Sequence, residues 1–385
     1  LLVLIGGWGS LSAQNVGSNY ARQVNTLIGT KGVGLTSGYL YPGATYPYGM
    51  VQFTPSYFSK RSGFVINQLS GGGCEHMGNF PTFPVKGKLK MSPDNILNYR
   101  INISEEKGHA GYYEAKVQED IHAKLTVTER TGMASYEYPA DQQYGTVIIG
   151  GGISATPIEQ AAIVITAPNK CEGYAEGGNF CGLRTPYKVY FVAEFDTDAL
   201  ESGTWKRDEL KPNTTFAEGE YSGVYFTFDV NKKKNIQYKI GVSYVSVENA
   251  RENLKAENTG WDFLQIQNQA ESKWNHYLGK IEVEGSNPDR TTQFYTHLYR
   301  SFIHPNVCSD VNGEYMGADF RVHKSRSKHY TSFSNWDTYR TQIQLLSILD
   351  PEVASDIVIS HQLFAEEAGG AFPRWVMANI ETGVM

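Results

Sequence analysis

A change of hydrophobic periodicity near residue 248 is the feature that most constrains how this chain can fold. Before it, over about residues 24–247, apolar and polar residues alternate in short runs, as at Tyr113, Ala115 and Val117, and turn residues separate the runs. A period of two is typical of strands that bury one face. Many such runs without an intervening helical pattern indicate a β-sandwich or barrel.

From Glu248 onward the apolar residues recur with a helical period and β-branched residues become rare. After a short strand-like stretch, KIEVEG, further helices are predicted near residues 291–304, 336–349 and 351–366. Asp350 should end the second of these, because a residue before proline is pushed out of the helical region. These helices indicate the opening of a second, helical domain, and we expect the chain to be a fragment at both ends.

Charge and the N-terminal sequence narrow the class of partner and the location. The 385 residues carry a net charge of −6 and no basic run longer than residues 232–234, which argues against nucleic acid. The opening LLVLIGGWGSLSAQN resembles the apolar part and cleavage site of a secretory signal peptide, with a buried strand as the alternative. It is too short to span a membrane. We therefore expect a secreted or periplasmic protein that does not span a membrane, with association to the cell surface as an alternative.

The four cysteines are compatible with export. Cys171 and Cys181 bracket the glycine-rich stretch EGYAEGGNF, and a bridge across a hairpin could join them. Cys74 and Cys308 are expected to be unpaired.

Two short segments concentrate chemically capable side chains. In FSNWDTYRTQIQLL, residues 333–346, Ser334 and Asp337 fit a helix capping box, but the same turn also holds an indole, a phenol and a guanidinium. In QLSGGGCEHMGNFPTFP, three glycines would let the backbone approach a ligand, although a loop that satisfies its own polar groups is the alternative. Self-contained catalytic signatures such as HExxH, CxxC, a Walker loop or GxSxG are absent from the sequence.

Taken in order, several motifs resemble the first half of glycoside hydrolase family 92. They are VNTLIGTKG, YPGATYPYGMVQFTPS, GGGCEHMGN, SEEKGHAGYYEAKV, FYTHLYRSFIHPNVCSDVNGEYMG, WDTYR and PRWVMANIETGVM. The resemblance covers about residues 24–385.

The resemblance implies an exo-acting, calcium-dependent and inverting α-mannosidase that acts on mannans or N-glycans, several members being from gut bacteria. It also implies a β-sandwich followed by an (α/α)₆ toroid. Residues 1–14 would be the signal remnant, 15–247 the sandwich, 248–290 a helical linker and 291–385 the incomplete start of the toroid. The family's acid, base and main calcium ligands lie in later helices, so no catalytic residue or metal ligand is assigned here. We expect the chain alone to hydrolyse nothing.

The sugar pocket implied by the family lies between the two domains. Carboxylate and guanidinium groups would hold adjacent hydroxyls of the sugar, and an aromatic ring would cover its C–H face. The candidates for contact with a mannose-containing glycan, with Asp337 first, are Asp337, Arg340, Trp336, Trp375, Cys74, Glu75, His76, Arg374 and Glu381.

Two departures from the family pattern leave the linkage open. TQIQLL follows WDTYR where members commonly have a His-Pro pair, and Asn79 stands where many have aspartate. Two alternative functions remain. The chain could be a glycan-binding protein without catalysis, or it could belong to a phosphorylase or lyase of sandwich-plus-toroid architecture.

Overall fold

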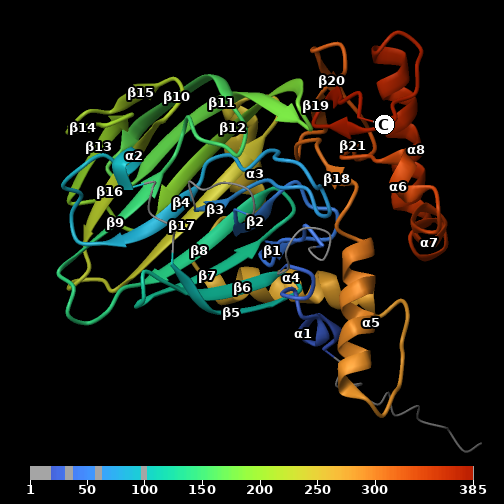
Figure 1. Ribbon diagram of the computed structural model, residues 1–385, viewed down its shortest axis with the longest axis horizontal. Helices are drawn as coiled ribbons and strands as arrows, with labels where there is room; N and C mark the ends of the chain where they lie inside the picture. Colours follow the sequence, from blue (N-terminus) through green and yellow to red (C-terminus); the bar gives the residue numbers. More distant parts are fainter. Residues whose placement is uncertain (1–18, 31–37, 57–62, 97–101, 385) are drawn as a thin grey trace, which may run out of the picture.

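Two antiparallel sheets packed face to face form most of the protein in a computed structural model that describes residues 19–30, 38–56, 63–96 and 102–384 (Figure 1). In spatial order, the first sheet holds β1 (Ala44–Thr45), β2 (Gln52–Pro55), β3 (Phe64–Val65), β4 (Thr82–Lys86), β9 (Tyr144–Ile149), β16 (Ser222–Asp229), β13 (Glu201–Lys206) and β14 (Glu209–Pro212). The second sheet holds β15 (Phe216–Glu218), β10 (Ile158–Ala167), β11 (Lys170–Phe180), β12 (Leu183–Phe195), β17 (Asn235–Ser243), β8 (Thr131–Glu137), β7 (Ile121–Val127), β6 (Tyr112–Val117) and β5 (Ile103–His109). Of the two predicted β architectures, the structure has the sandwich.

One apolar core joins the two sheets. The alternation seen in the sequence appears directly as burial, since Tyr113, Ala115 and Val117 of β6 are fully buried. Aromatic rings cross the interface: the ring centroids of Phe195 and Phe226 lie 4.9 Å apart. Fully burying a side chain of this kind stabilises the fold by about 1.5–3 kcal/mol, so the paired apolar faces hold the sandwich together.

Two helices extend the sandwich after β17. α3 (Val247–Glu257) begins at Ser246, whose side chain accepts from the Asn249 amide, and it packs on β17 and β12. α4 (Phe263–Leu278) packs on β7, and Trp274 Nε1–H donates to the Thr45 carbonyl over 2.7 Å. A short α1 (Tyr20–Gln23) lies against α4, and α2 (Pro93–Ile96) is a single turn.

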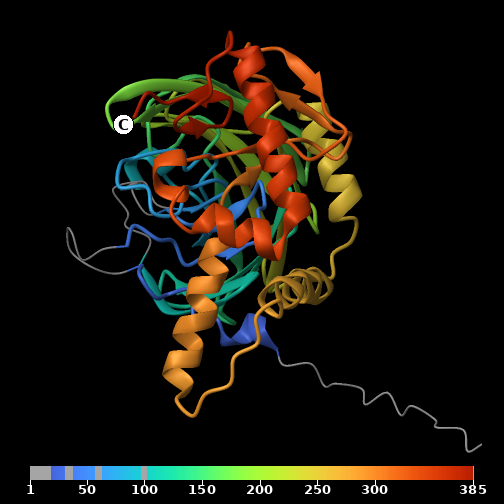
Figure 2. The ribbon, with the colours of Figure 1, turned by 90° about the vertical axis from the view of Figure 1, so that its right-hand side faces the viewer.

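The remaining helices lie at one end of the sandwich, where Figure 2 shows them in front of the strands. They are α5 (Pro288–Ser301), α6 (Asn335–Thr338), α7 (Gln342–Leu349) and α8 (Pro351–Glu367). Three two-stranded ladders accompany them: β18 (Asn306–Val307) with β21 (Tyr330–Thr331), β19 (Glu314–Met316) with β20 (Val322–Lys324), and β22 (Val376–Met377) with β23 (Ile380–Glu381). None of the described helices has the length and apolarity that a membrane crossing needs.

Three predicted local features differ from the structure. The helix expected over residues 336–349 is broken, because Thr341 has φ 73° and therefore cannot continue a right-handed helix. The predicted capping box does not form either: Ser334 donates to the Asp337 carboxylate, and no side chain caps α6. The stretch KIEVEG pairs with no strand in the described structure. The predicted signal remnant, residues 1–14, lies outside the described residues.

The predicted bridge between Cys171 and Cys181 was wrong, whereas the prediction that Cys308 is unpaired is confirmed. Cys74 is bonded to Cys181, with 5.2 Å between their Cα atoms, while Cys171 and Cys308 are buried free thiols. The stretch EGYAEGGNF is not a turn but the interior of β11. Since a strand rises about 3.3 Å per residue, Cys171 and Cys181 lie too far apart to bond.

Replacing Cys74 with serine should lower the free energy of unfolding by roughly 2–4 kcal/mol, because the bridge closes a loop of 107 residues. Denaturant unfolding of the wild type and of Cys74→Ser and Cys181→Ser measures this. Thiol titration of the denatured, unreduced protein should find two free thiols. Four thiols, or equal stability of all three proteins, would contradict the assigned bridge.

Candidate functional site

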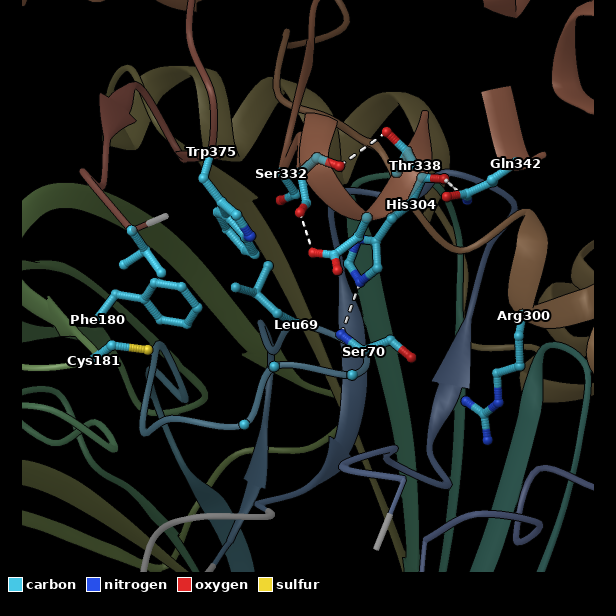
Figure 3. Close-up of a pocket in the computed structure, with 16 residues that line it drawn as sticks. Leu69, Ser70, Phe180, Cys181, Arg300, His304, Ser332, Thr338, Gln342 and Trp375 are labelled. Carbon is cyan, nitrogen blue, oxygen red and sulfur yellow. Dashed lines mark hydrogen bonds between the residues drawn. The ribbon is translucent and has the colours of Figure 1, made fainter. Parts of the chain in front are cut away.

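A pocket of about 480 Å³ lies where the end of the sandwich meets the helical part (Figure 3). Figure 3 shows Trp375 and Phe180 on one side of it and Arg300 and Gln342 on the other. Its lining comes from segments far apart in the sequence: Leu69, Ser70, Gly71, Gly72, Gly73, Phe180, Cys181, Arg300, His304, Ser332, Ser334, Asp337, Thr338, Gln342, Trp375 and Val384.

Two histidines, His76 buried and His304 half-buried, hold the wall formed by residues 69–73. The Leu69 amide donates to His76 Nε2 over 2.9 Å, and the next amide, Ser70, donates to His304 Nε2 over 2.8 Å. An amide N–H can only donate, so each Nε2 carries a lone pair and each ring bears its proton on Nδ1. His76 Nδ1–H then donates to the Cys74 carbonyl, and His304 Nδ1–H donates to Asn306 Oδ1. The loop is thus fixed from the sandwich and from the helical side.

The environment keeps both rings neutral. Burial disfavours the charged imidazolium and lowers the pKa of His76, and likewise that of His304, from 6.5 to about 4. Asn306 fixes the second ring further, because its amide Nδ2 donates to the Gly49 and Ile303 carbonyls and leaves only its oxygen for His304.

The aromatic side of the pocket rests on the sandwich. The ring centroids of Trp375 and Phe180 lie 4.7 Å apart. The His76 and Phe180 rings pack edge to face, with their centroids 5.9 Å apart. Phe180 ends β11 and precedes the bridged Cys181. The disulfide therefore joins the glycine-rich wall to the strand end that supports Trp375.

The opposite wall is a turn that pairs with the segment containing Trp375. Ser334 and Trp375 form an isolated antiparallel bridge, and the Asn335 amide donates to the Arg374 carbonyl over 3.0 Å. Ser334 Oγ donates to Asp337 Oδ2, while Asp337 Oδ1 has no hydrogen-bond partner among the described residues. Asp337 is thus oriented by its own turn and retains an oxygen for a ligand.

The structure brings only part of the predicted site together. Asp337 and Trp375 line the pocket, and Cys74 is joined to it through the bridge to Cys181. His76 lies behind the wall, and Glu381 accepts from the Arg374, Trp375 and Gly383 amides within the β22–β23 hairpin. The remaining predicted residues also lie outside the lining set: Trp336, Arg340, Glu75 and Arg374.

Asn79, one of the two departures from the family pattern, lies away from the pocket lining as well. It is buried, and its side-chain oxygen accepts from Asn67 Nδ2 over 3.0 Å and from the Tyr187 hydroxyl. Its amide donates to Asn67 Oδ1 over 2.8 Å. The residue therefore supports the strand that follows the glycine-rich loop.

Several lining residues were missed by sequence reasoning. Phe180 ends β11, Arg300 and Gln342 lie on α5 and α7, and His304 follows α5. The local pattern at each position is that of an ordinary core or surface residue. Gln342 follows the unforeseen break at Thr341 and donates to the Ser301 and His304 carbonyls. Only the fold brings these positions to one cavity.

The described lining of the pocket is poor in carboxylate ligands for calcium. Of its lining residues only Asp337 carries a carboxylate, whereas calcium takes six to eight oxygen ligands. A single carboxylate also falls short of the acid and base pair that glycoside hydrolysis uses. The described lining can hold and orient a polar ring, but its single carboxylate is too few for a carboxylate-rich calcium site or for a catalytic pair.

The two neutral histidines predict a pH dependence of stability. An unfolded histidine binds a proton near pH 6.5 but the folded rings do so near pH 4, so the unfolded chain binds more protons in this window. The free energy of unfolding should fall as pH falls from about 6.5 to 4, by on the order of 1 kcal/mol per pH unit for each ring.

Urea unfolding between pH 7 and 5 checks this. His76→Gln and His304→Gln should each weaken the dependence, whereas His122→Gln, at a half-exposed position on β7, should retain it. An unchanged slope in both buried-site variants would refute the assignment.

Comparison with known proteins identifies the family to which both parts of the chain are similar. Residues 23–243 match the glycosyl hydrolase family 92 N-terminal domain and residues 249–385 match the family 92 catalytic domain. A family 92 α-mannosidase of Bacteroides thetaiotaomicron superposes with a TM-score of 0.86 at 25% identity, over 96% of this chain and 52% of that one. An inverting family 92 mannosidase of the same organism gives 0.82 at 25%, over 97% and 51%.

A curated protein also matches the chain in sequence, again over only part of its own length. An uncharacterized secreted glycosidase of Arthroderma benhamiae is 26% identical over an alignment of 363 residues, and the match covers 83% of this chain and 45% of that protein. The chain therefore spans about half the length of the relatives it matches. Both family domains match in order across the described strands and helices, and the chain belongs to glycoside hydrolase family 92.

Proposed function

We propose that the chain is the sugar-holding portion of an α-mannosidase that releases terminal α-linked mannose from mannans or N-glycans with inversion. The observation that carries the proposal is the pocket between the two matched domains, with Asp337 and Trp375 on facing segments. Two structural relatives are family 92 mannosidases, and the structure of one is known in complex with mannoimidazole.

The lining suits a neutral, hydroxyl-rich ring. A carboxylate oxygen of Asp337 can accept from sugar hydroxyls, and hydrogen bonds to charged groups are worth about 1.5–3 kcal/mol. The Trp375 ring, held against Phe180, offers an apolar surface for the C–H face of the sugar. Gly71, Gly72 and Gly73 carry no side chain that would keep the ligand from the backbone. Together these features favour a monosaccharide unit at the end of a glycan.

The catalytic acid and base lie elsewhere in this proposal. Inverting hydrolysis places two carboxyl groups about 6.5–9.5 Å apart, and the pocket lining supplies one carboxylate. We infer that α5, α7 and α8 begin an (α/α)₆ toroid whose later helices supply the catalytic pair and the calcium ligands. The 385-residue chain alone should accordingly bind mannosides without hydrolysing them.

Export is part of the same proposal. The Cys74–Cys181 bridge is of a kind that persists in oxidising compartments, and the curated relative is described as secreted. A secreted or periplasmic enzyme would meet mannans and N-glycans outside the cell.

Mannose release by the full-length protein from a panel of α-linked mannobioses tests the proposed reaction. Release should occur with calcium present and stop when calcium is chelated, and the anomer first formed should be inverted. Absence of release, with mannose still bound, would instead support a glycan-binding protein without catalysis. The single carboxylate of the lining is the observation that favours this second function.

Two substitutions test the pocket itself. Asp337→Asn should weaken binding of α-mannobiose by about tenfold or more, because a charged acceptor is replaced by a neutral amide. Trp375→Ala should weaken it similarly by removing the ring that lines the pocket. Isothermal titration measures both effects.

Trp336→Ala is the matched control, because Trp336 lies on the same turn as Asp337, is 63% exposed and does not line the pocket. It should bind as the wild type does. Equal losses in the Trp375 and Trp336 variants would contradict this assignment of the pocket.

A further inference from the structure

Three potential metal ligands meet away from the pocket, at the junction of the β19–β20 hairpin with the end of α8 (Figure 1). Asp319 and His323 come from the hairpin and Glu367 from the last turn of α8. One ligand atom from each lies within 4.8 Å of the others, and all three residues are half-buried. None of them lines the sugar pocket.

Gly317 leaves a space among these three groups. A methyl group added to Gly317 would lie 2.7 Å from Asp319 Oδ1, 2.8 Å from Glu367 Oε2 and 2.6 Å from the His323 ring carbon Cδ2. These contacts are shorter than a carbon atom tolerates, so the three ligands surround the face of Gly317 that lacks a side chain. Gly317 does not have a positive φ, so its backbone conformation does not require glycine.

Neighbouring groups orient two of the ligands. Tyr315 donates to Glu367 Oε1 over 2.6 Å, and the Ala318 amide donates to Glu367 Oε2 over 2.9 Å. The Arg321 amide donates to Asp319 Oδ1 over 3.1 Å. Tyr315 itself is fixed by stacking on His329, with ring centroids 3.7 Å apart. Such outer contacts are what holds ligands in place around protein-bound metals.

The ligand types select the class of metal. Zinc binds one imidazole and two carboxylates at about 2.0–2.2 Å, which puts ligand atoms roughly 3.4 Å apart around a tetrahedral ion. His323 Nε2 and Asp319 Oδ1 are already 2.9 Å apart, and small side-chain rotations would complete the set. Calcium and magnesium prefer oxygen alone, so the imidazole disfavours them.

We propose that Asp319, His323 and Glu367 bind one zinc-like divalent transition metal, with water as the fourth ligand, and thereby tie the β19–β20 hairpin to α8. In the neutral ring, the proton that His323 Nε2 donates to Asp319 moves to Nδ1 on binding, so that Nε2 offers its lone pair to the metal and the ring remains neutral. Arg321 lies 4.0 Å from Asp319, but its side chain is 82% exposed and can turn to solvent.

Isothermal titration with zinc chloride tests the site, using the chain without a histidine tag after chelator treatment and dialysis. We expect one zinc per chain. His323→Ala, Glu367→Gln and Gly317→Ala should each weaken binding by about tenfold or more. The last variant is the sharpest, because it retains all three ligands and fills only the space between them. Cobalt substitution should give the visible absorption of a four-coordinate site.

His122→Ala is the matched control, since His122 is a partly exposed histidine whose Nε2 lies 3.5 Å from a glutamate on the sandwich. It should bind zinc as the wild type does. Circular dichroism confirms that each variant is folded. Absence of zinc binding by the wild type, or binding that is unchanged in Gly317→Ala and His323→Ala, would overturn the proposal.

Discussion

Burial of alternating side chains between the two sheets is the constraint on which the rest of the structure depends. The same apolar cluster that contains Phe195 and Phe226 also contains Cys308, Trp375 and Met377 from the helical part. The segment that carries Trp375 is therefore held by the sandwich core, and the pocket wall that it forms cannot move independently of the sheets.

Polar contacts also connect the helical part to the sandwich. Asp310 accepts from Ser243 at the end of β17 and from Asn249 and Asn253 of α3, and burial raises the pKa of its carboxyl group. Arg130 donates to the Ser309 carbonyl and pairs with Glu257 at the end of α3. A buried charge is tolerated only when it is paired or hydrogen-bonded, so these partners fix the path of the chain as it leaves the sandwich.

Hydrogen bonds from two consecutive backbone amides to distant side chains hold the glycine-rich wall of the pocket in place. Leu69 and Ser70 donate to two imidazoles that are 228 positions apart in the sequence, His76 and His304. The Cys74–Cys181 bridge then fixes the same loop covalently. A wall fixed in this way can present bare backbone to a ligand, which a glycine-rich loop without such supports could not do reliably.

The sequence by itself determined the β half and the start of the helical half near residue 248, and it singled out the segments containing Asp337 and Trp375, two residues that line the pocket. Periodicity and caps are local properties, and the order of motifs specifies a family. It did not determine the break at Thr341, the partner of Cys74, or the roles of Phe180, Arg300, His304 and Gln342. Those depend on which distant segments meet, and only the packing of two sheets against the helical part decides that.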